Sequence, residues 1–410
     1  MERKPVHLIM VTAENNNKFY DMVPKGDYIE IKYGRVDSTC TTIQKPMSEW
    51  DKIYKSKVKK GYVDQSDLVA DLVEKVVAKK DMEYKPIPNK VIANIVERLQ
   101  DFAKKAIDAN YKVKANQVTQ AMIDKAQDIL VKLTTCKTVK SFNDNLLELF
   151  TVIPRKMGNV SSYLANDKDD FGKIISKEQD LLDVMKGQVV VAQLSEPTNE
   201  DEEYQNNCTI LEALGIEIEE TTDEDVKLIK KELGDCADRY YASWKVKNIK
   251  TDERFKKFCK EENLKKKDIK LLFHGTRNEN VWSILKTGLV LRPTNAIITG
   301  KMFGMGLYNA PKARKSLGYT SFGYWTRGNA NTGFMILHEV AYGKPYDVYA
   351  FDSKYYDLDY DKLQKYCPGA HCLHAHAGMD TGSSWGSLKN DEIVVYKEEQ
   401  MNAKYLIEVK

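Results

Sequence analysis

Three short segments in the second half of the sequence carry residues whose types and spacing suit ligand chemistry. The first is LLFHGTR at 271–277, an apolar run that leads into His274 and Gly275. A strand that ends this way presents an imidazole, and the next residue, which lacks a Cβ, lets a ligand approach the backbone closely. Taken alone the pattern is weak, because a single histidine is more often structural.

The second segment is glycine-rich. It reads GKMFGMGLY at 300–308 and is followed by KSLGY at 315–319. Its glycines predict tight turns, and Tyr308 and Tyr319 are placed to sandwich a flat ring or to fill a core. It is not a phosphate-binding loop, because no Gly-Lys-Ser/Thr ending follows and no GxGxxG opens a helix.

The third segment is KNDEIVVY at 389–396, in which Glu392 begins an apolar strand. Acids are rare at such positions unless a ligand or cation accompanies them. The plainer alternative is a solvated edge-strand acid, which is what we expect of Glu398 and Glu399.

In their order and separations, these segments resemble the poly(ADP-ribose) polymerase family, the diphtheria-toxin-like ADP-ribosyltransferases. The family's signature combines a His-Gly-Ser/Thr strand end, a Met-Phe-Gly-x-Gly-Ile/Leu-Tyr segment, Lys-Ser-x-x-Tyr and a Glu that opens a late strand. All four occur here in order, and NAKYL at 402–406 looks like the family's closing strand. The joint match is specific although each motif alone is not.

The resemblance implies an enzyme that splits NAD⁺ at its nicotinamide bond and transfers ADP-ribose to protein, itself included. Loss of nicotinamide develops positive charge on the ribose, which a nearby carboxylate stabilises more in the transition state than in the ground state. Glu392 matches the family's glutamate, and the implied catalytic residues are Glu392, His274 and Tyr319.

The same resemblance implies the NAD⁺ contacts. His274 would hold the adenosine ribose, while the Gly275 backbone and the Ser316 hydroxyl would bind the nicotinamide carboxamide. Tyr319 and Tyr308 would stack on the two faces of the nicotinamide ring. The implied NAD⁺-binding positions are His274, Gly275, Thr276, Asn280, Arg292, Tyr308, Ser316 and Tyr319.

Two positions depart from the family's pattern. Met305 stands where a lysine is common, which removes a cation near the acceptor side. Val290 stands where an arginine is common, and Arg292 is close enough to substitute.

A length of 410 residues predicts two or three domains. Residues 1–85 read as strands, at 7–12, 19–23 and 28–36, with a helical pattern from Ser48. Residues 86–194 carry helical periodicity, 195–207 read as an exposed acidic linker, and 208–410 are mixed, with strand-like runs at 269–273, 333–340, 392–396 and 405–409. The expected fold is multidomain α+β: a small β-rich domain, an all-α bundle and an α+β catalytic domain.

The helical part is predicted from apolar residues at steps of three and four. One face is Val91, Ile95, Leu99, Phe102 and Ala106. A second face is Val118, Met122, Ala126, Ile129 and Leu133, and a third is Phe142, Leu146 and Leu149.

By resemblance, 86–194 looks like the family's regulatory helical domain and 1–85 like a WGR domain that senses DNA ends or nicks. Tyr33 replaces the tryptophan of that domain's name and keeps an aromatic face. Arg35 would position a DNA end or bridge to the helical domain.

Lysines interleaved with aromatic residues either contact phosphates or form a solvated helix face. The implied DNA-binding residues are Tyr33, Arg35, Lys55, Lys57 and Lys59. In this interpretation the helices obstruct NAD⁺ entry until DNA favours their opening.

A Cys/His-rich stretch near 370 invites a zinc interpretation, since four ligands are available within ten residues. Its spacings do not match the usual paired ligand motifs, so we expect a plain loop and no metal. The residues are Cys367, His371, Cys372, His374 and His376.

The remaining composition sets outer bounds. A net charge of +3 confines any nucleic-acid surface to a local patch, and no apolar run approaches the ~20 residues of a membrane span. Seven scattered cysteines and no secretion-type leader indicate free thiols, with a nuclear location by resemblance and otherwise a cytoplasmic one.

Two alternatives remain, a catalytically silent DNA-end-binding scaffold and an NAD⁺ glycohydrolase. The sequence leaves open polymer or single-unit transfer, the acceptor residue and the oligomeric state.

Overall fold

The computed structural model describes residues 3–36, 38–68, 84–111, 118–194, 208–291, 302–380 and 386–410, with side chains of 187–194 left aside. The chain forms two compact units, Met1–Met82 with Lys104–Gln193 and Glu83–Ala103 with Leu194–Lys410. The expected linker at 195–207 and Arg292 lie outside the described residues. Among the helices described, none combines the length and apolarity that a membrane crossing needs.

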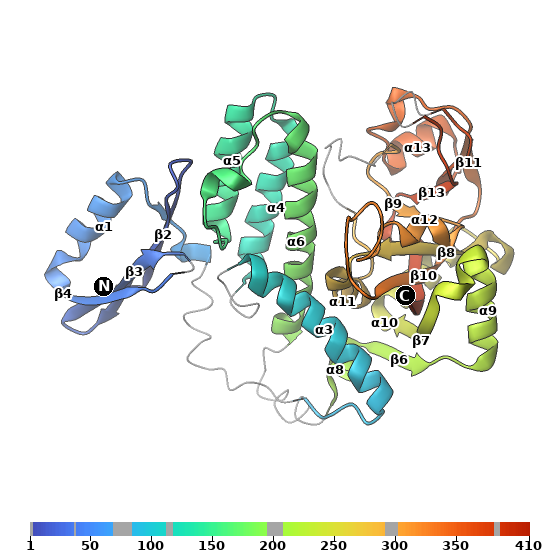
Figure 1. Cartoon of the computed structure of the whole chain (residues 1–410), viewed down its shortest axis with the longest axis horizontal. Helices are drawn as coiled ribbons and strands as arrows, with labels where there is room; N and C mark the ends of the chain where they lie inside the picture. The colour runs from blue at the N-terminus through green and yellow to red at the C-terminus, as the bar shows by residue number, and fades with distance from the viewer. Residues whose placement is uncertain are drawn as a thin grey trace. The chain divides into compact units, whose positions relative to one another are not determined.

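The first unit contains a five-stranded antiparallel sheet in the order β4-β3-β2-β1-β5. Apolar and polar residues alternate along β3 and assign its side chains to the two faces of the sheet: Ile29 and Ile31 are buried, while Lys32 is exposed. Helix α1 (Trp50–Lys59) comes between β4 and β5 in the chain and lies beside the sheet (Figure 1). Its Trp50 packs into the sheet's apolar cluster. The strands are β1 Val6–Val11, β2 Asn17–Lys25, β3 Tyr28–Arg35, β4 Thr41–Pro46 and β5 Val63–Asp64.

Three helices of the same unit, α4 (Gln120–Thr135), α5 (Val139–Val152) and α6 (Asp169–Leu194), run side by side (Figure 1). Thr119 and Thr138 cap the first two, each accepting a bond from a backbone N–H in the first turn. The rings of Phe142 and Phe171 stack at 3.9 Å between centroids and join α5 to α6. The predicted apolar faces of α4 and α5 are buried throughout, which confirms the periodicity.

Helix α3 (Lys90–Asn110) is divided between the two units: its residues up to Ala103 belong to the second unit and the rest belong to the first. Its predicted face was wrong in part. Ile95 and Leu99 are buried, but Val91 is 47% exposed and the buried face also contains Ile92, Val96, Ala103 and Ile107. The sequence is apolar at both 91 and 92, and spacing alone does not decide which of two adjacent apolar residues faces the core.

The second unit is built on an antiparallel sheet in the order β6-β7-β14-β10-β8. Its central strands β10 and β14 are buried almost throughout, as expected for strands covered on both faces. The strands are β6 Ile216–Glu220, β7 Tyr240–Asn248, β8 Ile269–Thr276, β10 Gly333–Ala341 and β14 Met401–Val409.

A second sheet, ordered β11-β12-β13-β9, lies in the same unit. Only the β11–β12 pair among its pairings is parallel. Reciprocal backbone bonds between Phe273 and Ala310, at 2.8 and 3.0 Å, tie β8 to the end of β9 and therefore join the two sheets. The strands are β9 Leu307–Asn309, β11 Pro345–Val348, β12 Cys372–Ala375 and β13 Glu392–Val395.

Short helices surround these sheets. They are α8 Ile210–Leu214, α9 Asp223–Leu233, α10 Ile249–Glu261, α11 Asn278–Thr287, α12 Ala313–Leu317 and α13 Tyr360–Tyr366. The coarse prediction of a mixed α+β chain is confirmed. The three-domain division at 1–85, 86–194 and 208–410 stays a prediction.

One buried ion pair stands out in the first unit. The Arg155 guanidinium donates to the Glu178 carboxylate, and their side chains are 1% and 5% exposed. Arg155 also donates to Asn110 Oδ1 at 2.9 Å. Three aromatic rings lie within 5.2 to 5.7 Å of its charge, those of Tyr111, Phe150 and Tyr163.

We expect Arg155→Met to destabilise the first unit by about 3–5 kcal/mol, because it leaves the buried Glu178 carboxylate without its cation. Urea unfolding followed by circular dichroism measures this. Lys140→Met removes an ion pair whose partners are 86% and 59% exposed and should leave the midpoint unchanged. Equal midpoints for Arg155→Met and wild type would contradict the assignment.

Candidate active site

His274 lies within β8, where it pairs with Ile336 of β10. Its Nδ1 is 3.1 Å from the carbonyl oxygen of Tyr308 in β9, and this bond fixes the orientation of the imidazole ring. The strand continues to Thr276, one residue beyond the His-Gly end that the sequence predicted.

Gly275 has no room for a side chain. A Cβ built on it would lie 1.8 Å from the carbonyl oxygen of Ser316 in α12. The Ser316 hydroxyl donates to the Phe273 carbonyl at 3.0 Å and is buried. Glycine is therefore required because β8 and α12 meet backbone to backbone.

Glu392 is the first residue of β13 and is 6% exposed. Lys315 of α12 places its Nζ 2.6 Å from Glu392 Oε1, and the lysine side chain is itself 13% exposed. The cation balances a carboxylate that would otherwise be costly to bury. Sequence reasoning included Lys315 in the motif but assigned it no role.

Tyr308 and Tyr319 both lie within electrostatic range of Glu392. The Tyr308 hydroxyl accepts from the Phe303 N–H and donates to the Gly304 carbonyl, both at 3.0 Å. Burial, and secondarily the charge of Glu392, raises the pKa of Tyr319 to about 12. The same two causes raise the pKa of Tyr308 well above its usual range. Both phenols therefore stay neutral at physiological pH.

Tyr319 keeps an accessible ring, 38% exposed, and stacks against Trp325 with centroids 6.5 Å apart. Trp325 is a neighbour that sequence reasoning missed, and it is 53% exposed. Its indole also contacts Gly318, where a Cβ would lie 2.6 Å from the ring.

In the described part of the glycine-rich segment, Gly304 and Gly306 are required by packing. Gly304 has φ +72°, and a Cβ there would lie 2.1 Å from the Leu358 carbonyl oxygen. A Cβ on Gly306 would lie 2.2 Å from the Val394 side chain of β13. These contacts bring β9 against β13, so Tyr308 and Glu392 share one small sheet.

Asn280 of α11 sits beside β8 and donates from Nδ2 to Thr276 Oγ1 at 3.2 Å. Both residues are buried, and Asn280 Oδ1 has no hydrogen-bond partner in the described part of the chain. A buried amide oxygen of this kind suits a ligand donor.

The five candidate DNA-binding residues lie on the first unit's sheet and on α1. Tyr33 stacks on Tyr20 at 5.5 Å between ring centroids. Lys57 does not point away from the sheet, because its Nζ lies 3.7 Å from the Tyr20 ring centroid. Lys55 and Lys59 are exposed.

Arg35 is committed to contacts within the first unit. It donates to both oxygens of Asn15, at 2.8 and 2.9 Å. It also donates to the carbonyls of Met157 and Gly158, at 3.1 and 2.8 Å, in the segment that follows α5. Of the two roles considered for Arg35, the bridge to the helical segment fits these contacts.

Comparison with known proteins decides the family. Residues 223–410 match the poly(ADP-ribose) polymerase catalytic domain. The chain is 37% identical over 186 residues to uncharacterized protein 101L of Invertebrate iridescent virus 6, covering 44% of this chain and 76% of that protein. It is 32% identical over 167 residues to the putative poly(ADP-ribose) polymerase-like protein 100L of the same virus, covering 40% and 82%. The chain belongs to the poly(ADP-ribose) polymerase family.

This poly(ADP-ribose) polymerase family member is an NAD⁺ ADP-ribosyltransferase, with NAD⁺ as its substrate. A weaker likeness runs along almost the whole chain. Poly(ADP-ribose) polymerase 1 of Gallus gallus is 23% identical over 429 residues, covering 96% of this chain and 38% of that longer protein.

His338 is a buried neighbour of the site that sequence reasoning missed. It lies on β10, is 2% exposed, and its ring centroid is 6.1 Å from that of His274. Burial, with the nearby His274 second, lowers the pKa of His338 from 6.5 to about 3. The imidazole is therefore neutral in the folded chain over most of the acid range.

This shift predicts an acid sensitivity. Between pH 6.5 and about 3, His338 is protonated in the unfolded chain and neutral in the folded chain. The free energy of unfolding therefore falls as the pH falls through this window. His338→Gln removes that proton and should reduce the slope of unfolding free energy against pH by up to about 1.4 kcal/mol per pH unit. Urea titrations at several pH values measure the slope, and an unchanged slope would contradict a neutral His338.

Proposed function

We propose that this ADP-ribosyltransferase transfers ADP-ribose to protein acceptors, itself included, and that DNA ends or nicks raise its rate in the nucleus. Glu392, His274 and Tyr319 would be its catalytic residues. The observation that carries the proposal is the meeting of β8, β9, α12 and β13 around Glu392. Direct bonds link these segments: His274 to Tyr308, Ser316 to Phe273, and Lys315 to Glu392.

The chemistry follows from the charge that develops when nicotinamide leaves. The ribose gains oxocarbenium character, and a carboxylate already fixed beside it stabilises that charge without reorganising. Lys315 holds Glu392 in place and would yield part of that pairing as the substrate's positive charge grows. In the same proposal Glu392 accepts a hydrogen bond from the ribose and orients the acceptor hydroxyl.

NAD⁺ would be held by groups on the elements around Glu392. The Gly275 backbone and the Ser316 hydroxyl would bind the carboxamide, which requires Ser316 to exchange its present bond to Phe273. The accessible ring of Tyr319 would stack on the nicotinamide, with the anchored ring of Tyr308 on its other face. His274, Thr276 and Asn280 would contact the adenosine side.

Glu392→Gln should lower kcat by about 10²–10³, because it keeps the shape of the side chain and removes the charge. Initial rates of nicotinamide release from labelled NAD⁺ measure this. Glu399→Gln, a control on the turn that follows β13, should keep the wild-type rate. A loss below tenfold in Glu392→Gln would contradict the proposed role.

The fate of the label tests the acceptor. Label on protein in a denaturing gel supports transfer, as a band for single units or a smear for polymer. Free ADP-ribose with no labelled protein would instead indicate NAD⁺ hydrolysis, and no turnover would indicate a silent scaffold.

The proposed DNA response is supported by the contacts of the first unit. Exposed Lys55 and Lys59 offer positive charge on α1, while Lys57 of the same helix lies against the rings of Tyr20 and Tyr33. Arg35 connects β3 to the segment after α5 through hydrogen bonds, so a ligand bound on the sheet would be coupled directly to that segment. Relief of obstruction by the helices would need only about 2.7 kcal/mol for a hundredfold activation.

A short 5′-phosphorylated nicked duplex should raise the initial rate of the full chain. Lys55→Glu with Lys59→Glu should reduce the response, because charge reversal repels phosphate. Lys137→Glu, at an exposed position between α4 and α5, is the matched control and should respond as wild type. Equal initial rates with and without the duplex would contradict activation by DNA, but not the proposed transferase activity.

A further inference from the structure

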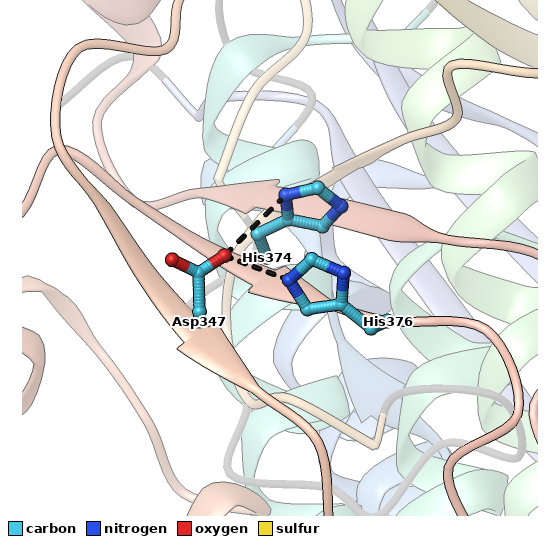
Figure 2. A group of neighbouring side chains, drawn as sticks. All are labelled: Asp347, His374 and His376. Carbon is cyan, nitrogen blue, oxygen red and sulfur yellow. Dashed lines mark hydrogen bonds and ion pairs between the residues drawn. The ribbon is translucent and has the colours of Figure 1, made fainter.

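The edge of the small sheet in the second unit gathers two imidazoles and a carboxylate. Asp347 lies on β11, and its register partner on β12 is His374. His376 follows two residues after His374, just beyond the end of β12. Figure 2 shows a nitrogen of each imidazole directed at the same oxygen of Asp347. These ligand atoms all lie within 4.8 Å of one another.

Their separations suit a small cation. Asp347 Oδ1 is 2.7 Å from His376 Nε2 and 3.7 Å from His374 Nδ1. Ligands bound to Zn²⁺ at about 2.0–2.1 Å in a tetrahedron lie about 3.3 Å apart. The two measured separations lie on either side of that value.

A second carboxylate, that of Asp391, contacts the His374 ring nitrogen that points away from Asp347. Asp391 Oδ2 is 3.3 Å from His374 Nε2, and Asp391 Oδ1 accepts from the Ala377 N–H at 2.8 Å. A carboxylate on the far nitrogen is the usual outer partner of a metal-binding histidine, because it fixes the tautomer and the ring orientation. It leaves Nδ1 as the nitrogen that faces Asp347.

Three contacts must change when an ion binds. The imidazoles of His374 and His376 stack at 4.0 Å with planes 21° apart, so His376 must rotate to aim its lone pair at the ion. Its side chain is 26% exposed, and this rotation also breaks its stacking on Tyr349, whose ring centroid lies 4.3 Å away. The Tyr342 hydroxyl, 2.8 Å from His374 Nδ1, must also give up that contact.

The cysteines of the same stretch do not belong to this group. Cys372 is buried with its Sγ 3.3 Å from the Tyr342 carbonyl oxygen. The neighbouring His371 accepts from the Lys344 N–H at 3.0 Å. The set of thiols and imidazoles considered from the sequence therefore does not come together, and the aspartate that replaces the thiols comes from another strand.

We propose that Asp347, His374 and His376 bind a divalent transition-metal ion, with Zn²⁺ as the best match to two imidazoles and a carboxylate, and with water at the fourth position. This departs from the expectation of no metal.

In β12 and β13, Ala375 pairs with Glu392 while His374 pairs with Ile393. Since neighbouring side chains alternate between faces, the ion lies on the face opposite Glu392 and joins β11 to β12 rather than entering the transfer reaction.

Calorimetric titration of chelator-treated full chain with Zn²⁺ tests the proposal, with Co²⁺ absorption as a second readout of the ligand field. One ion should bind per chain. His376→Ala and Asp347→Asn should each weaken binding at least tenfold, in line with the loss of one ligand.

Two further variants keep the test specific. Tyr342→Phe removes the competing hydroxyl and should bind at least as tightly as wild type, while Cys367→Ser should bind as wild type. Circular dichroism confirms that each variant is folded, and Glu392→Gln should bind the ion normally whatever its activity. No binding by wild type, or binding lost in Cys367→Ser and kept in His376→Ala, would overturn the assignment.

Discussion

A carboxylate that is 6% exposed at the head of an apolar strand needs a cation, and Lys315 supplies one 2.6 Å from Glu392. The rest of the site depends on this pair. The residue next to Lys315, Ser316, donates a hydrogen bond to the Phe273 carbonyl of β8. The helix that carries the cation is thus fixed to the strand that carries His274.

The close approach of β8 and α12 explains why the motif residues form one constellation. Gly275 brings the two backbones together, and Gly306 does the same for β9 and β13. The site therefore lies where two sheets meet, with His274 from the larger sheet and Tyr308 and Glu392 from the smaller one. Both glycines are fixed by neighbouring atoms in the fold, whatever ligand occupies the site.

Strong local patterns in the sequence predicted much of this. The alternation at 28–36 and the apolar run at 333–340 correspond closely to β3 and β10, because burial of one or both faces dictates their composition. The short strands β9 and β12 were missed. A strand of three or four residues carries no periodicity of its own. Both strands pair with β13, from which β9 is distant in sequence.

The residue types of the candidate site were predictable, but their partners were not. Spacing identifies Lys315 as part of a motif and gives no sign that its charge meets Glu392. Nothing in the sequence marks His338, which becomes a neighbour of His274 only through the pairing of β10 with β8. Similarly, the stretch near His374 looked like a loop because Asp347, which completes the cluster, lies on a different strand.

A crystal structure of the chain with a non-hydrolysable NAD⁺ analogue would show whether Glu392 reaches the nicotinamide ribose. We expect the nicotinamide carboxamide to bond to the Gly275 backbone and the Ser316 hydroxyl, its ring to lie against Tyr319, and Glu392 to lie at the adjoining ribose. An analogue bound elsewhere, or bound with Glu392 out of reach of that ribose, would contradict this expectation.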